Sequence, residues 1–172
     1  MVKPSFRLLW SHYPRGSPEN VLRGIGWDGM IGNPSYENTC AIRMSICLAA
    51  SGQPVRSSQG MKALSGGVRG SPIEVRQDAI SRHLEQRWGA PLKMSAKDAE
   101  RQINGRDGVV SFFGIAGYNV GGRDGGHIDV IDGTVSERGL FGYIWSRSIQ
   151  YNYGTHGYMD RSASVWFWEM PR

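Results

Sequence analysis

Apolar side chains recur at helical spacing in the first hundred residues, whereas after residue 108 they gather in short runs of β-branched and aromatic residues. The first pattern is typical of amphipathic helices and the second of strands. We therefore expect helices first and strands second. The predicted helices span residues 6–10, 41–50, 72–88 and 95–103.

The two longest predicted helices carry terminal signals. Asn38 or Thr39 can cap the helix over 41–50, and Gly52 lies just past its end. For the helix over 72–88, Ser71 is the expected N-cap, with Pro72 at the first position. Glu74 takes the capping-box position, and Gly89 follows the last residue. Between these helices, residues 14–36 and 55–70 are rich in Gly, Pro and Ser, which predicts irregular loops.

The second half of the chain predicts an antiparallel sheet. Its glycine-rich stretch over 118–126 has no apolar periodicity and is expected to form a mobile lip between the first two strands. Helices followed by strands indicate an α+β fold, and a length of 172 residues fits one domain over 1–172. The predicted strands span residues 109–116, 127–132, 140–145 and 164–170.

Charge and composition narrow the classes of function. The chain carries 20 Lys and Arg against 15 Asp and Glu, a formal net charge of +5. This balance favours acidic polymers as partners, but the arginines are scattered singly, which argues against nucleic acid. No apolar run approaches the ~18 residues of a membrane span, and the first residues lack the features of a secretory signal. We expect a protein that is not inserted in a membrane and that reaches any site outside the cytoplasm without a signal peptide.

The two cysteines, Cys40 and Cys47, have different expected roles. On one helix they lie about 10 Å apart along the axis, too far for a disulfide, and two cysteines cannot supply the four ligands of a structural zinc site. Cys40 falls at the helix start, where the positive end of the helix dipole favours a thiolate, so it is either a nucleophile or a small buried residue. Cys47 lies two turns further on among apolar residues and is expected in the core.

A cysteine nucleophile needs a base, and among the four histidines His127 is the candidate. His127 begins a predicted strand after a glycine-rich stretch, a position that often displays catalytic groups. The order of Cys40 and His127 along the chain is that of papain-like cysteine hydrolases. For the group that orients His127, Asp129 shares its strand face but lies about 6.6 Å along the strand. Glu137 can return alongside His127 after the turn, whereas Asp132 faces the opposite way.

Three stretches of the sequence resemble the type VI secretion amidase effectors of the fourth family. They are ENTCAIRMSICLAASGQPV around the cysteine, GGHIDVIDG around the histidine and the opening KPSFRLLW. The resemblance implies a papain-like, NlpC-like cysteine hydrolase with N-terminal helices packed on a C-terminal antiparallel sheet. It identifies Cys40 with the nucleophile and His127 with the base of a Cys-His-Asp site that needs no metal or cofactor.

The third residue departs from the family pattern. The family acid stands about eleven positions after its histidine, where this sequence has Arg138. Either Glu137 serves after a shift of one residue, or Asp129 does. The cysteines of the family's loop disulfide after the histidine strand have no counterpart here.

The resemblance also implies a substrate and partners. Members of the family cut the γ-D-glutamyl–meso-diaminopimelate bond of peptidoglycan stem peptides. The type VI secretion machinery delivers them into the periplasm of a target cell, and a periplasmic immunity protein neutralises them in the producer. The residues alone leave two alternatives: a cysteine protease or transglutaminase-like enzyme that acts on protein, and a non-catalytic cell-wall-binding module.

Overall fold

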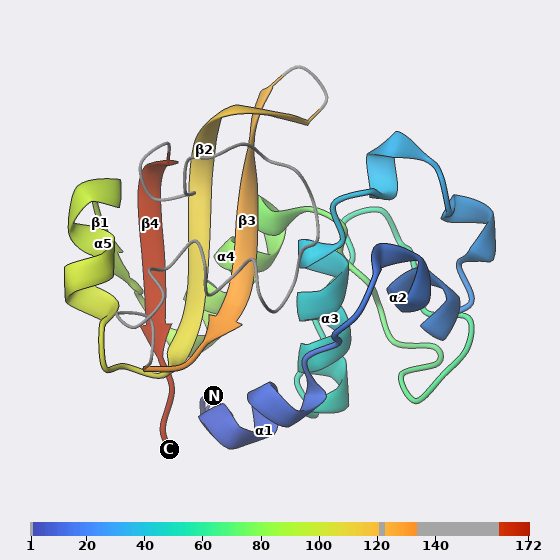
Figure 1. Cartoon of the computed structure of the whole chain (residues 1–172). Coiled ribbons are helices and arrows are strands. Elements are labelled where there is room, and N and C mark those ends of the chain that lie inside the picture. The colour runs from blue at the N-terminus through green and yellow to red at the C-terminus, as the bar shows by residue number, and fades with distance from the viewer. Residues whose placement is uncertain (1, 121–122, 134–161) are drawn as a thin grey trace.

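Four strands form the sheet in the part of the chain that the structure, a computed structural model, describes: residues 2–120, 123–133 and 162–172. Every pair of neighbours is antiparallel, and the order across the sheet is β1-β4-β2-β3 (Figure 1). Strands β4 and β2 form the centre of the sheet, and β1 and β3 form its two edges. The strands are β1 (Leu92–Met94), β2 (Gly108–Val120), β3 (Arg123–Ile131) and β4 (Ser162–Glu169).

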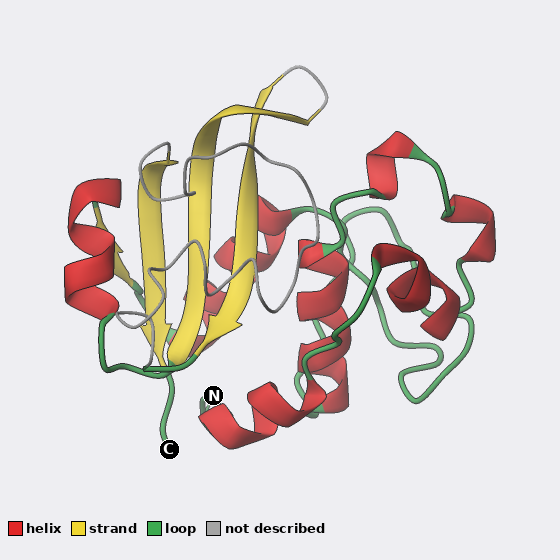
Figure 2. Ribbon diagram, viewed as in Figure 1, coloured by secondary structure: helices red, strands yellow, loops and turns green. Residues whose placement is uncertain are grey.

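The same described ranges hold five α-helices, of which α2 lies beyond α3, away from the sheet (Figure 2). Helix α3 lies alongside β3 with α1 packed against it, α4 contacts β2 and β3, and α5 packs against β4. The mixture of helices and an antiparallel sheet confirms the predicted α+β class. The helices are α1 (Phe6–His12), α2 (Pro18–Gly24), α3 (Cys40–Ala50), α4 (Gln77–Trp88) and α5 (Ala96–Ile103).

The alternation of side chains along β3 separates two buried clusters. Ile128 and Val130 pack with residues of α1, α3 and α4, whereas Ile131 packs in a second cluster with residues of α5 and β4. Because successive strand residues point to opposite faces, His127 and Asp129 share the face of Ile131. A strand with an apolar cluster on each side is held firmly, which makes it a rigid support for the polar pair.

The predicted start of the second long helix is wrong by several residues. Helix α4 begins at Gln77 rather than Pro72. The carboxylate of Glu74 accepts hydrogen bonds from the backbone N–H groups of Val75 and Arg76, at 2.9 Å each, and from that of Ser58 at 2.6 Å. Glu74 therefore satisfies backbone donors in a non-helical segment before the helix, instead of closing a capping box inside it.

Residues 14–36 are not irregular throughout, as the loop composition predicted. They contain α2 and two 3-10 turns, Asp28–Met30 and Pro34–Tyr36. Ser17 caps α2 by accepting a hydrogen bond from the N–H of Asn20, and Pro18 occupies the first turn. The α2 side chains pack in a third buried cluster with Ile42 of α3 and Ile73, and this burial stabilises a helix too short to be stable alone.

The glycine-rich stretch over 118–126 is strand rather than lip where it is described. Strand β2 continues to Val120 and β3 starts at Arg123, with Asn119 paired to Asp124. Irregular pairing after Phe112 accommodates this extension. The predicted strand over 140–145 lies outside the described residues. Strand β1 was not predicted, because three residues carry too little periodicity.

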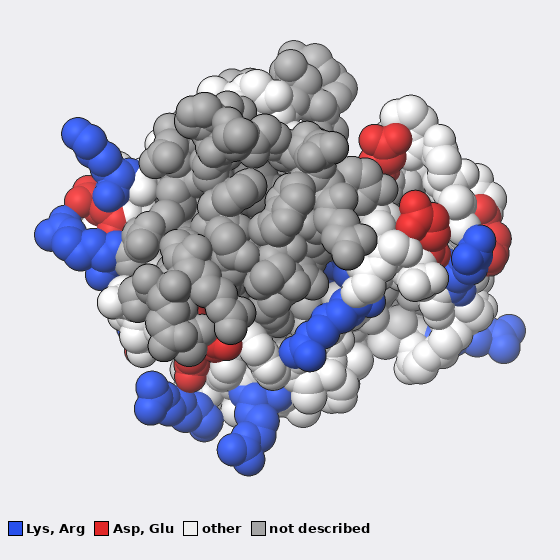
Figure 3. Space-filling view, viewed as in Figure 1, with Lys and Arg blue, Asp and Glu red and all other residues white. Residues whose placement is uncertain are grey.

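The charged surface agrees with the scattered arrangement expected from the sequence. On the face shown in Figure 3, the described Lys and Arg side chains lie at several places around the edge of the view and form no single patch. Among the described helices, none has the length and apolar content needed to cross a membrane.

Candidate active site

The start of α3 holds Cys40 in a network of hydrogen bonds. The Asn38 side chain accepts a hydrogen bond from the Cys40 N–H at 3.1 Å, so Asn38 satisfies the first donor of the helix. Thr39 is the N-cap, but its hydroxyl accepts from the Arg43 guanidinium at 2.9 Å instead of capping the backbone. Cys40 itself is 5% exposed. Hydrogen bonds of Asn38 and Thr39, the two residues before Cys40, thus fix the position of the nucleophile candidate.

Strand β3 brings the histidine and the first acid candidate to this helix start. The Cys40 Sγ lies 4.0 Å from the carbonyl oxygen of Gly126, the residue before His127. The His127 Nε2 lies 3.7 Å from Asp129 Oδ2, and both side chains are fully buried. Residues far apart in the sequence therefore form one cluster with the order sulfur, imidazole, carboxylate.

The cluster favours a charged imidazole. Burial alone would lower the pKa of His127, but Asp129 and Cys40 favour the protonated ring and raise its pKa to about 9. The ring of Phe112, paired with His127 across β2 and β3, lies 6.3 Å away between centroids and adds no charge. His127 therefore carries a proton at neutral pH, which suits an ion pair with a cysteine thiolate.

Gly126 permits the close packing around the cluster. A Cβ atom at this position would collide with the side chain of Gln77 and would stand 2.7 Å from the carbonyl oxygen of Phe112. The Gln77 amide in turn donates hydrogen bonds to Ser81 and Ser111, joining the start of α4 to β2. A residue larger than glycine would push β3 away from α4 and displace the neighbouring His127.

Sequence reasoning missed Tyr13, which reaches the cluster from the end of α1. Tyr13 is 4% exposed and shares a buried cluster with Cys40. Burial raises the pKa of Tyr13 well above its usual value, and the charge and hydrogen bonding of Asp129 raise it further, whereas the charge of Arg43 lowers it. The phenol is therefore a neutral hydrogen-bond donor beside the Asp129 carboxylate. No local pattern marks this contact, because it joins the N-terminal segment to a strand more than a hundred residues later.

The other candidates from the sequence do not join the cluster. Cys47 is buried in the core as predicted, and both cysteines are free thiols. The Nδ1 of His12 lies 3.3 Å from the Ser51 hydroxyl, and His83 is half-buried on α4. Glu137 and His156 lie outside the described residues. Within residues 2–120, 123–133 and 162–172, no group of three or more His, Cys, Asp or Glu side chains is placed to hold a metal ion.

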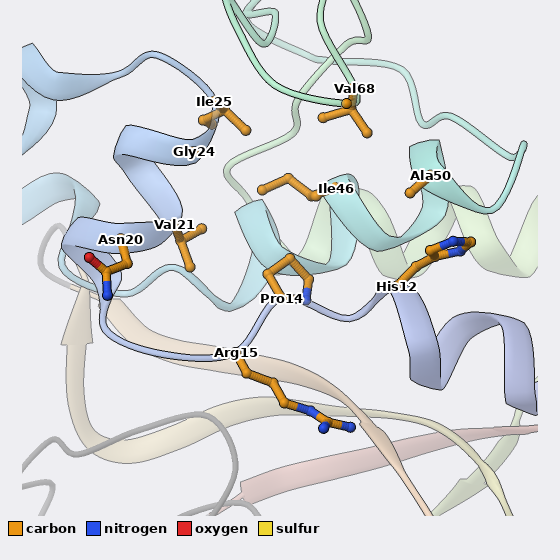
Figure 4. A pocket seen from close by; sticks show the side chains of 11 residues that line it. His12, Pro14, Arg15, Asn20, Val21, Gly24, Ile25, Ile46, Ala50 and Val68 are labelled. Atoms are coloured by element: carbon orange, nitrogen blue, oxygen red, sulfur yellow. The ribbon is translucent and has the colours of Figure 1, made fainter.

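A separate pocket of about 510 Å³ lies between α2 and α3. Figure 4 shows His12 and Pro14 at its edge, facing Ile46 and Ala50 of α3, with Val21 of α2 nearby. None of Cys40, His127 or Asp129 lines it.

The family comparison covers most of the chain. The model of type VI secretion system amidase effector protein 4, Tae4, matches residues 36–168, a stretch that includes α3, the cysteine, the histidine strand and all but the final residue of the last strand. The chain belongs to the Tae4 family. No curated protein matches the chain.

Solved Tae4 structures share the fold over nearly the full length. The crystal structure of the type VI effector Tae4 from Enterobacter cloacae has a TM-score of 0.71 and 21% sequence identity, and the alignment covers 99% of each chain. Tae4 in the effector–immunity complex Tae4–Tai4 from Salmonella Typhimurium has a TM-score of 0.61 and 21% identity, covering 98% of this chain and 99% of that one. At this identity the likeness shows the fold alone.

Membership of the Tae4 family fixes the class of activity. The protein is an amidase effector of the type VI secretion system, and therefore a hydrolase with an antibacterial role. The family match includes both Cys40 and His127 but begins after Tyr13.

Proposed function

We propose that this Tae4 family member is a cysteine amidase that cuts the γ-D-glutamyl–meso-diaminopimelate bond of peptidoglycan stem peptides. The observation that carries the proposal is the buried cluster of Cys40, His127 and Asp129, with Cys40 Sγ at 4.0 Å from Gly126 O and His127 Nε2 at 3.7 Å from Asp129 Oδ2. A thiol at a helix start beside an imidazole that a carboxylate holds is the arrangement that nucleophilic catalysis by cysteine requires.

The geometry supports a two-step reaction. With Nε2 turned to Asp129, Nδ1 of His127 already holds the proton given up by Cys40, and the thiolate attacks the γ-glutamyl carbonyl carbon. The C–N bond breaks as the imidazolium gives its proton to the leaving diaminopimelate amine, leaving a thioester on Cys40. His127 then takes a proton from water, the hydroxide attacks the thioester, and the γ-carboxyl product leaves as the thiol is restored.

Asp129 is our choice for the orienting acid. Its Oδ2 faces the imidazole, while Oδ1 accepts a hydrogen bond from the N–H of Val130 at 2.7 Å. Both oxygens are therefore engaged, and the carboxylate is buried, which fixes its direction. Glu137 remains the alternative from the sequence, outside the described residues.

The proposal extends to fold type and domain organisation. A cysteine on an early helix, packed against a later antiparallel sheet that carries the histidine, is the order of papain-like and NlpC-like hydrolases, to which we assign the chain. We treat 1–172 as one catalytic domain, because α1 and β4 pack in one buried cluster despite lying at opposite ends of the sequence. The formal net charge of +5 suits an acidic wall polymer.

We further propose a periplasmic site of action and an immunity partner. The Tae4 proteins from Enterobacter cloacae and Salmonella Typhimurium are solved in complex with the immunity protein Tai4, and their chains align with this one over almost the whole length. An effector that attacks the wall from the periplasm needs such an inhibitor in its producer. We expect a cognate immunity protein of that kind.

Digestion of purified sacculi tests the activity. The protein should release fragments with a new diaminopimelate amino terminus, identified by mass spectrometry, and the Cys40→Ala variant should release none. Cleavage of casein without these fragments would indicate a protein-directed cysteine protease. Binding to sacculi without any cleavage would indicate a non-catalytic wall-binding module, and either result would contradict the proposal.

A further inference from the structure

Arg43 is a buried cation at the start of α3, one turn after Cys40. It is 1% exposed and makes three hydrogen bonds with uncharged acceptors. Its Nε donates to Thr39 Oγ1 at 2.9 Å, Nη1 to the carbonyl oxygen of Pro14 at 3.0 Å and Nη2 to that of Gly16 at 2.7 Å. The planar guanidinium therefore uses all three of its nitrogens to join two separate segments.

Each segment that Arg43 holds adjoins a residue of the candidate active site. Thr39 directly precedes Cys40, so the bond to its hydroxyl fixes the residue that enters the helix. Pro14 directly follows Tyr13, whose phenol lies beside Asp129. The Arg43 side chain therefore links the segment next to Cys40 with the segment next to Asp129.

The energetic cost of this arrangement argues for a role beyond folding. Burying a charge without a carboxylate partner is unfavourable, and the partners of Arg43 among the described residues are three uncharged acceptors, which offset only part of the lost hydration. A neutral side chain of similar volume would fill the space with less desolvation. Such costs are expected where a site requires them, and among the described residues of this site the buried carboxylate is that of Asp129.

We propose that Arg43 is a positioning residue that clamps the 14–16 segment onto the start of α3, and so holds Tyr13 against Asp129 in the geometry that orients His127. Tyr13 acts as the donor that fixes the Asp129 carboxylate, and Arg43 fixes Tyr13. The inference rests on the proposed function. It adds a residue from the N-terminal segment, outside the stretch 36–168 that the family model matches.

The Arg43→Lys variant tests the clamp. Lysine keeps the charge but presents one nitrogen, so it cannot hold Thr39, Pro14 and Gly16 together. On a soluble stem tetrapeptide we expect kcat to fall on the order of 10- to 100-fold while KM changes little, because misplaced catalytic groups mainly affect the chemical step. The matched control is Arg106→Lys, which removes a fork that binds Gln102 O and Glu169 away from the site and should leave kcat unchanged.

A readout without substrate separates this inference from the proposed function. The rate of Cys40 alkylation by iodoacetamide at pH 6 reports how well the His127–Asp129 pair supports the thiolate, whatever the natural substrate is. We expect slower alkylation in Arg43→Lys than in the wild type. A folded Arg43→Lys with wild-type kcat and a wild-type alkylation rate would overturn the clamp. Amidase activity retained by Cys40→Ser would instead overturn the proposed function. The alkylation rate of Arg43→Lys would still test the role of Arg43 in that case.

The Tyr13→Phe variant keeps the inference testable if Arg43→Lys fails to fold. It removes only the phenol oxygen beside Asp129, and we expect about a 10-fold loss of kcat together with slower Cys40 alkylation. Tyr36→Phe is the matched control, since its hydroxyl donates to Met61 Sδ at 3.9 Å, away from the cluster, and it should behave as the wild type. A Tyr13→Phe protein with wild-type kcat and alkylation rate would show that Tyr13 does not position Asp129.

Discussion

The two cysteines of α3 share a helix, burial and one apolar cluster, yet different polar groups surround their sulfur atoms. Cys40 begins the helix, and its Sγ lies 4.0 Å from the carbonyl oxygen of Gly126, next to the buried imidazole of His127, which carries a proton at neutral pH. Cys47 lies two turns later and contacts the carbonyl oxygen of Leu9 at 3.2 Å within an apolar cluster. Burial therefore does not distinguish a reactive cysteine from a structural one. The difference lies in which polar groups reach the sulfur, and at Cys40 they come from β3.

Replacing each cysteine by alanine should change a different property of the protein, and the largest effect, a loss of activity, is expected at Cys40. Cys40→Ala should lower the rate of stem-peptide hydrolysis by at least about 10³-fold, because no other group in the cluster replaces the nucleophile. The thermal unfolding midpoint should change little, since the residue lies at the helix start. Activity in Cys40→Ala combined with a dead Cys47→Ala would reverse the two assignments.

The next largest loss of activity is expected at Asp129, the acid beside His127. Asp129→Asn keeps the shape but removes the charge beside His127, and we expect a loss of about 10²- to 10⁴-fold in kcat, within the range for neutralising a triad acid. Asp132→Asn and Glu137→Gln are the controls in the same assay. A loss confined to Glu137→Gln would transfer the orienting role to that residue, and wild-type rates for all three would mean that no carboxylate is needed.

The charged imidazole should also appear in the pH dependence of stability. The pKa of His127 is raised in the folded state to about 9, above its unfolded value of about 6.5, so its protonated ring stabilises the fold fully below pH 6.5. This contribution is lost as the pH rises towards 9. Urea unfolding should show the free energy falling over that window, with a smaller fall in Asp129→Asn. An equal fall of the unfolding free energy in the wild type and in Asp129→Asn would argue against an interaction between His127 and Asp129.

The smallest effect is expected at the other end of the helix. Cys47→Ala should keep near-wild-type hydrolysis and lose about 1–2 kcal/mol of stability, because it leaves a small cavity in the core and removes the contact with Leu9 O. Chemical denaturation alongside the rate assay measures both quantities. A loss of activity without a loss of stability would give Cys47 a catalytic role.

The sequence predicted the elements that have local signals. Helix α3 has a cap, good helix formers and a glycine stop, and it begins within one residue of the predicted start. Helix α4 begins later than the Ser-Pro-x-Glu sequence over 71–74 predicted. The reason is that Glu74 accepts hydrogen bonds from the backbone N–H groups of its own loop and of Ser58, and does not close a capping box. A capping signal shows that backbone donors need an acceptor, but not which donors will use it.

The candidate site was predictable only in part. The helix-start position singled out Cys40, and the strand pattern placed His127 and Asp129 on one face. Backbone spacing suggested that these two were too far apart, but the side chains lean towards each other to 3.7 Å. The contacts of Tyr13 and Arg43 depend on how the N-terminal segment crosses α3, and no local pattern encodes that crossing.

Stoichiometric alkylation followed by peptide mapping tests the central claim most directly. Treating the protein with one equivalent of iodoacetamide at neutral pH should label Cys40 and not Cys47, with loss of amidase activity proportional to the label on Cys40. Full labelling of Cys40 with activity intact, or inactivation that follows the label on Cys47, would contradict the assignment of Cys40 as the nucleophile.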